Sequence, residues 1–130
     1  MEEKTLIQNG VIIDGTGGKP RKESILIDKC SIKATGKDAD KLADSNDVIK
    51  IDASGKTIMP GLIDAHIHVT FDEPSSNDEL FFHRREALSA IVAAHNAKKV
   101  LYAGVTGFCD PDSLHSIGVD LRDAIKSGYV

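Results

Sequence analysis

The first half of the chain consists of short apolar runs broken by polar residues. Runs of this kind within 5–14, 24–37 and 48–61 predict β-strands joined by tight turns, because alternation with a period of two gives a strand one buried face. The turns are predicted at Asn9-Gly10, Asp28–Cys30 and Ser54-Gly55. The polar stretch 37–47 is compatible with a single helical turn or a loop. The front of the chain is therefore predicted to be a small all-β unit.

The hydrophobic pattern changes after Pro60-Gly61. The run LIDAHIHV (62–69) predicts an extended strand in which Ile63 and Ile67 pack on one face. Ser76 followed by Glu79 is typical of a capping box, and it predicts a helix over 77–102. The helical period predicts a buried stripe, and Gly104 is expected to end the helix. The stripe consists of Ala87, Ile91, Ala94, Ala97/Lys98 and Leu101.

A second strand and a second helix follow. The run 105–110 predicts a short buried strand, and 118–128 predicts an amphipathic helix that ends at Gly128. Strand, long helix, strand and helix in this order are typical of βα units on a parallel sheet. We therefore expect an α/β fold with two parts, a β-rich part over 1–59 and two βα units over 60–130.

Composition and charge argue against several classes of function. The chain has 130 residues, 41% of them hydrophobic, and a net charge of −4 without a basic stripe, which argues against nucleic-acid binding. Neither a signal-peptide core nor an apolar run of membrane-spanning length is present in the sequence. Cys30 and Cys109 lie far apart and form no CxxC motif, so we expect a reduced, cytoplasmic protein. The glycine-rich stretch 14–20 is interpreted as a turn, because Pro20 and a strand follow it where a phosphate-binding loop would begin a helix.

Polar residues at alternate positions interrupt the strand predicted at 62–69. Residues i and i+2 of a strand face the same side about 6.5–7 Å apart, so His66 and His68 project together with Asp64 one step behind. Two neutral imidazoles in this arrangement are able to bind one divalent metal ion such as Zn²⁺. The alternative is that they are core histidines with hydrogen-bond partners, or that the end of the strand is solvated.

The motifs together resemble a known family. NGVIIDGTGGKP, IDASGKTIMPGLIDAHIHV, AGVTGFCD and LRDAIKSG resemble the N-terminal portion of a metal-dependent amidohydrolase, most closely the imidazolonepropionase-like and prolidase-like group. The resemblance implies the start of a (β/α)₈ TIM-like barrel, preceded by part of a small β-sandwich domain. It also implies a site for one or two divalent metal ions, expected to be zinc, with His66 and His68 as ligands. Asp64 and Asp110 are candidates for supporting roles around these ligands.

The resemblance further implies hydrolysis of amide, cyclic-amide or dipeptide C–N bonds by metal-activated water. In the family, a carboxylated Lys or a Glu, two more His and an Asp general base come from later strands. We expect those strands to lie outside these 130 residues, so no catalytic residue is assigned here and the chain is not expected to be active alone. The expected partner is a small amide or dipeptide, with neither nucleic acid nor membrane, and self-association into a homo-oligomer is a further expectation.

Other interpretations remain open at this stage. A non-catalytic amidohydrolase-like scaffold or assembly domain is the alternative function. His83 and His95 fall on the predicted long helix, and we expect them to face solvent or cap it. His115 follows the second strand and is a weaker candidate for lining a substrate pocket.

Overall fold

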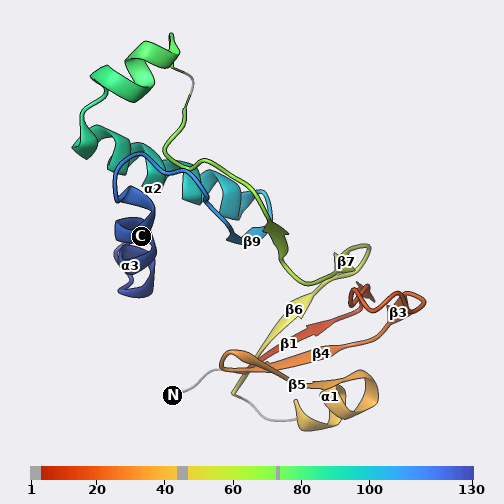
Figure 1. Ribbon diagram of the computed structural model, residues 1–130. Helices are drawn as coiled ribbons and strands as arrows, with labels where there is room; N and C mark the ends of the chain where they lie inside the picture. Colours follow the sequence, from red (N-terminus) through yellow and green to blue (C-terminus); the bar gives the residue numbers. More distant parts are fainter. Residues whose placement is uncertain (1–3, 44–46, 73) are drawn as a thin grey trace. The chain divides into compact units, whose positions relative to one another are not determined.

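The computed structural model describes residues 4–43, 47–72 and 74–130 (Figure 1). The chain forms two compact units, Met1–Pro60 and Gly61–Val130. Both units are mixed α/β structures with open sheets, and within the described residues the strands do not close into a barrel.

The larger sheet of the first unit has the strand order β5-β4-β1-β6. The strands are β1 (Lys4–Gln8), β4 (Ile25–Asp28), β5 (Ser31–Thr35) and β6 (Val48–Asp52). β4 is antiparallel to both β1 and β5, whereas β6 is parallel to β1. The hairpin predicted around Asp28–Cys30 is confirmed as β4–β5, and Lys29 takes the positive φ of 57° that its turn requires.

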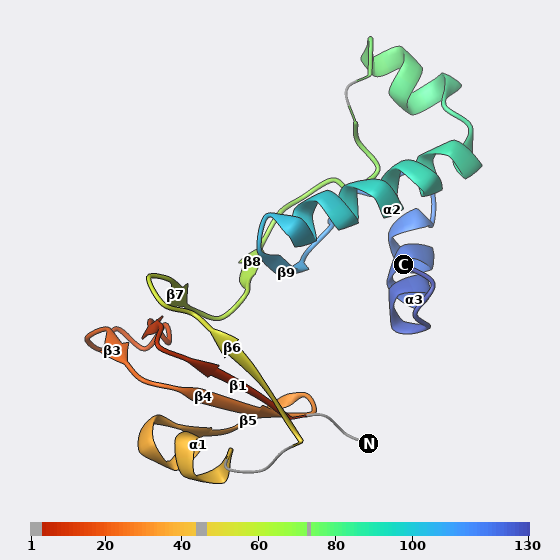
Figure 2. The ribbon, with the colours of Figure 1, turned by 180° about the vertical axis from the view of Figure 1, so that it is seen from behind.

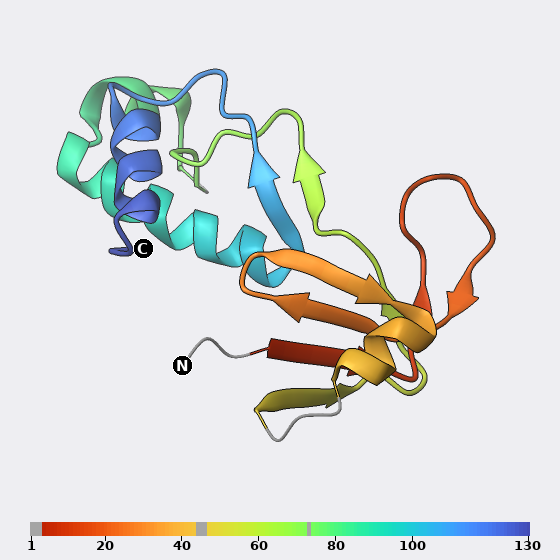
Figure 3. The ribbon, with the colours of Figure 1, turned by 90° about the horizontal axis from the view of Figure 1, so that it is seen from below.

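A short helix covers one face of this sheet. Helix α1 (Gly36–Leu42) packs against β4 and β5, as Figure 3 shows, and occupies the stretch for which a helical turn or a loop was predicted. Leu6 and Leu26 of the sheet and Ala39 and Ala43 at the helix form the core, with Leu26 only 1% exposed. Because successive side chains of a strand point to opposite faces, the alternation of apolar residues gives the sheet one apolar face, and this face packs on the helix.

A second, smaller sheet has the order β3-β2-β7. Its strands are β2 (Val11–Ile12), β3 (Arg21–Lys22) and β7 (Thr57–Ile58). The turn predicted at Asn9-Gly10 is confirmed by the φ of 67° at Asn9, but β1 and β2 on its two sides belong to different sheets. Gly10 is needed here, because a Cβ on it would lie 2.6 Å from the Ile58 side chain. Asn9-Gly10 therefore passes the chain from one sheet to the other.

The glycine-rich stretch after β2 is a turn, as predicted. The Asp14 carboxylate accepts hydrogen bonds from the Thr16 amide, the Thr16 hydroxyl and Arg21, and these contacts lower the pKa of Asp14 to about 2. Because this carboxylate is satisfied by the loop's own donors, the stretch has a structural explanation that requires no bound phosphate.

The second unit contains the parallel strand pair β8 (Leu62–Asp64) and β9 (Val105–Phe108). Helix α2 (Glu86–Tyr102) lies between them in sequence and packs on β9, and α3 (Ile117–Lys126) packs on α2 (Figures 1 and 2). The predicted strand–helix–strand–helix order with parallel pairing is confirmed. The core consists of Val69, Ala93, Ala97, Ile117 and Leu121.

The single helix predicted over 77–102 is wrong. A π-helical turn, η1 (Glu79–His83), is followed by extended backbone at Arg84 and Arg85 before α2 begins. The break has a long-range cause: the Arg84 guanidinium, 7% exposed, donates to the Thr70 carbonyl at 3.4 Å and forms an ion pair with Glu79 at 3.3 Å. The helical pattern alone contains no information about the Thr70 partner.

Half of the predicted capping box is present. The Ser76 hydroxyl accepts the Glu79 N–H at 3.1 Å, whereas the Glu79 carboxylate bonds Ser75 instead of Ser76. Hydrogen bonds from Ser75 and then Arg84 hold the pKa of Glu79 below its usual 4.5. This carboxyl therefore stabilises the folded segment fully above pH 4.5, and its contribution is lost as the pH falls through the lowered folded pKa.

An NMR titration of the full-length protein tests this pH dependence. We expect the Glu79 carboxyl to titrate below 4.5 and the free energy of unfolding to decline over the same range. Replacing Glu79 with Gln should remove that part of the decline. A midpoint at or above 4.5 would contradict the hydrogen bonds from Ser75 and Arg84.

The buried face of α2 also differs from the predicted stripe. Ile91 is 68% exposed and Leu101 is 56% exposed, and Ala87 is exposed as well. The buried residues of α2 are Ser89, Ala93, Asn96 and Ala97. The helix has apolar residues around most of its circumference, so periodicity gave no unique answer about which side meets the core. Small residues, and not the largest apolar ones, face β9 and α3.

Ser89 provides a test of packing on this face. It is completely buried, and its hydroxyl has no hydrogen-bond partner among the described residues. Replacing Ser89 with Ala is expected to raise the free energy of unfolding by about 1 kcal/mol, because it removes an unsatisfied buried hydroxyl and improves helix propensity. Urea denaturation of the full-length protein measures this, and a loss of stability would show that the hydroxyl is satisfied.

The structure also bears on membrane spanning and on the state of the cysteines. None of the helices in the described part of the chain is long and apolar enough to cross a membrane. Cys30 and Cys109 are both exposed and free.

Candidate metal centre

His66 and His68 follow strand β8 and do not form part of it. The strand predicted to reach Val69 ends at Asp64, where the carboxylate accepts the His66 amide at 3.1 Å and the chain bends. Ile63 is 77% exposed, so its predicted packing is also wrong within the described residues. Beyond the bend, the Ile67 amide donates to the Cys109 carbonyl at 3.0 Å, which keeps the segment beside the end of β9.

The two imidazoles nevertheless meet. His66 Nε2 lies 3.3 Å from His68 Nε2, and the ring planes are inclined at 85°. Two nitrogens bonded to one tetrahedral Zn²⁺ at about 2.0–2.1 Å would lie about 3.3–3.4 Å apart. The same distance also suits a hydrogen bond in one pairing of tautomers. The distance between the two nitrogens therefore matches that of two ligands on one metal ion, if both Nε2 atoms carry lone pairs.

Asp110 lies directly behind this pair, at the end of β9. Its side chain is 6% exposed, and Oδ2 accepts the Val69 amide at 3.3 Å and the Ser113 hydroxyl. Asp110 Oδ1 lies 3.9 Å from His68 Nδ1, which is buried and has no hydrogen-bond partner in the described structure. Metal-bound histidines usually donate their other N–H to such a carboxylate, which fixes the tautomer.

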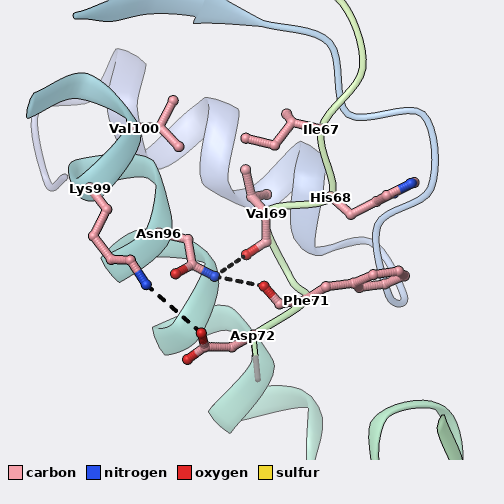
Figure 4. Close-up of a pocket in the computed structure, with 8 residues that line it drawn as sticks. All are labelled: Ile67, His68, Val69, Phe71, Asp72, Asn96, Lys99 and Val100. Carbon is pink, nitrogen blue, oxygen red and sulfur yellow. Dashed lines mark hydrogen bonds and ion pairs between the residues drawn. The ribbon is translucent and has the colours of Figure 1, made fainter. Parts of the chain in front are cut away.

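Rings extend from His68 toward η1. His68 stacks on Phe71 with centroids 4.7 Å apart, and Phe71 meets the edge of Phe81 at 5.5 Å. Beside this segment is a hollow of about 470 Å³, shown in Figure 4. Its lining residues are Ile67, His68, Val69, Phe71, Asp72, Asn96, Lys99 and Val100.

The sequence patterns missed two residues that contact this loop, Asn96 and Arg84. Asn96 Nδ2 donates to the carbonyls of Val69 and Phe71, and Arg84 donates to the Thr70 carbonyl between them. The available signal for Asn96 was an amide within the small-residue stretch AAHNA of the helix.

The remaining histidines lie apart from this pair. His83 is exposed on η1, with its Nδ1 3.0 Å from Asp78 Oδ2, and His95 is exposed on α2, so their predicted solvent-facing positions are confirmed. His115 is exposed with a φ of 55°. Within residues 4–43, 47–72 and 74–130 no group of three or more His, Cys, Asp or Glu side chains is placed to hold a metal ion. These residues thus supply one pair of candidate ligands.

Comparison with known proteins places these features in context. No protein-family model matches the chain. A dihydroorotase from Caldanaerobacter subterraneus subsp. tengcongensis is 44% identical over 66 residues, which are 51% of this chain and 14% of the dihydroorotase. An enamidase from Eubacterium barkeri is 32% identical over 118 residues, which are 88% of this chain and 27% of the enamidase.

A comparison with solved structures finds a similar fold along almost the whole chain. A Xaa-Pro dipeptidase with methionine bound in its active site matches with a TM-score of 0.81 and 31% identity, over 98% of this chain and 31% of the dipeptidase. The chain spans less than a third of the length of each of these three proteins.

Proposed function

The chain corresponds to the N-terminal part of amidohydrolase-superfamily proteins, and from this premise we propose that the protein is a metal-dependent hydrolase of C–N bonds. The proposed substrates are small amides, cyclic amides or dipeptides. This choice draws on the dihydroorotase, the enamidase and the Xaa-Pro dipeptidase among the similar proteins.

The observation that carries this proposal is the convergence of His66 and His68. Their Nε2 atoms lie 3.3 Å apart at the carboxyl end of a strand that pairs in parallel with its neighbour. In open and closed parallel sheets alike, active sites form at this end of the strands. We propose that these two residues hold a divalent ion, expected to be zinc, alone or as one of two ions. Such an ion would polarise a substrate carbonyl and lower the pKa of water.

The chain's own residues prepare this site. His66 and His68 act as ligands in the tautomer that carries its proton on Nδ1, which leaves the Nε2 lone pair of each ring free for the ion. Asp110 favours that tautomer of His68, because its carboxylate lies 3.9 Å from Nδ1. Asp64 holds the bend after β8 through the His66 amide. The two aspartates thus have proposed positioning roles.

We extend the proposal to the architecture. Residues 60–130 would be the first two βα units of a (β/α)₈ barrel, and residues 1–59 would be part of a β-sandwich domain. The parallel pairing of β8 with β9 through α2 and the two small sheets of the first unit support this. A cytoplasmic location and self-association into a homo-oligomer remain predictions from the sequence.

Metal analysis of the full-length protein, combined with a panel of dipeptides and cyclic amides, tests the proposed function. We expect about one or two equivalents of divalent metal per chain, and hydrolysis that a chelator abolishes and added zinc restores. A folded protein with neither metal nor hydrolysis would overturn the proposal and favour the non-catalytic scaffold.

A further inference from the structure

The loop that follows His68 is held by side chains from outside it. Three successive carbonyls, those of Val69, Thr70 and Phe71, all accept side-chain hydrogen bonds. Asn96 supplies two of these bonds, at 3.0 Å to Val69 and 2.9 Å to Phe71. Figure 4 shows the Asn96 amide reaching from α2 to both carbonyls. One side chain thus bridges the residues on either side of Thr70.

Asn96 is unusual for its position on the helix. It lies on the buried face of α2 beside Ala93 and Ala97 and is only 8% exposed. An amide buried without partners is costly, whereas here both N–H hydrogens of Nδ2 are used. An apolar residue at this point would bury the Val69 carbonyl without its donor. The side chain therefore joins the rigid helix to the loop, and packing alone does not account for it.

We propose that Asn96 is the positioning residue of the candidate metal-ligand loop. It fixes the backbone directly after His68, and the Asp110 carboxylate fixes the same point from the other side through the Val69 amide. Val69 is held at both its N–H and its carbonyl, so the His68 ring is presented toward His66 from an immobilised backbone. The inference rests on the proposed function, because it assigns Asn96 a role in metal binding.

The substitution Asn96→Asp separates positioning from packing. Aspartate has nearly the same shape, but it replaces the two donated hydrogens with an oxygen that faces two carbonyl oxygens. The loop is then repelled from α2 while the volume of the buried face is retained. Asn96→Ser is a milder second variant, because one hydroxyl hydrogen can satisfy at most one carbonyl.

The decisive measurement is the zinc affinity of the full-length protein. Metal-free protein is titrated with zinc against a competing chelator. We expect Asn96→Asp to weaken zinc binding about 10–100-fold, as replacements of residues supporting metal ligands do, and Asn96→Ser to weaken it less. His95→Ala is the matched surface control on the same helix, since His95 is exposed. Leu121→Ala lowers the stability of the same unit from its core, and it should leave the zinc affinity unchanged.

The outcomes distinguish this inference from the proposed function. If the unsubstituted protein binds neither zinc nor another divalent metal, the proposed function fails and this inference fails with it. If it binds zinc and Asn96→Asp binds equally well, the positioning role is overturned while the proposed function stands. An equal loss of affinity in Leu121→Ala would assign the effect to general destabilisation and would also overturn the inference. Should Asn96→Asp not fold, an unchanged affinity in Asn96→Ser overturns it.

Discussion

Replacing both His66 and His68 with alanine is expected to remove the bound metal from the full-length protein and to lower its hydrolytic activity at least about 10³-fold. The two Nε2 atoms lie 3.3 Å apart, so they would hold one ion together, and the loss of both leaves that ion without its ligands from this chain. A metal ion contributes several kcal/mol of charge stabilisation to such a reaction, which corresponds to the expected fall in rate. Metal content per chain and kcat for the best substrate are the two measurements.

A matched double variant controls for the loss of two imidazoles. His83 and His95 are both exposed and lie on η1 and α2. Replacing them together with alanine should leave metal content and activity unchanged. Full activity and full metal content in the His66/His68 variant would refute the assignment of these residues as ligands.

Removing the Asp110 carboxylate is expected to affect stability and metal binding together. In Asp110→Ala the buried Val69 amide and the Ser113 hydroxyl lose their acceptor, which should cost about 2–4 kcal/mol of the free energy of unfolding. Metal affinity should also fall about 10–100-fold, because His68 Nδ1 loses the only carboxylate recorded beside it in the described structure. Denaturation of the metal-free protein and zinc titration separate these two effects.

Asp110→Asn sharpens this test, because it retains the size of the side chain and one acceptor oxygen. We expect a smaller loss of stability but still a weakened affinity for zinc, since the charge beside His68 has gone. The neighbouring Asp112 is exposed, and Asp112→Ala provides the control. Unchanged zinc affinity in both Asp110 variants would restrict Asp110 to a purely structural role.

Local patterns predicted the elements whose causes are local. Hairpin β4–β5, the turn at Asn9 and the stop at Gly104 depend on residues within a few positions of one another, and Gly104 indeed has a φ of 92°. The break at Arg84 was missed because its partner, Thr70, lies fourteen positions away. The side of α2 that meets the core was missed because apolar residues surround the helix, and contact with β9 and α3 then selects small side chains.

In the candidate site, too, the features with local causes were predicted and those with long-range causes were not. The spacing of His66 and His68 predicted that their side chains would project together, and they do, although the backbone bends after Asp64 where an extended strand was predicted. The alternation was therefore a correct guide to the pair and an incorrect guide to the backbone. Asn96 escaped prediction because a polar residue in a helix is normally assigned to solvent, and its two carbonyl partners become evident only in three dimensions.

The parallel pairing of β1 with β6 has a consequence for the order in which the first unit assembles. Strand β1 meets β4 after a short excursion of the chain, but it meets β6 only after one that is roughly twice as long. The extra loop closure costs only about 0.6 kcal/mol of entropy, yet β6 leaves the ribosome later than β4 and β5. During synthesis, β1, β4 and β5 are able to pair before β6 is made, which leaves one edge of β1 free. Docking of β6 on that free edge is therefore expected to be the last step in the assembly of this sheet during synthesis.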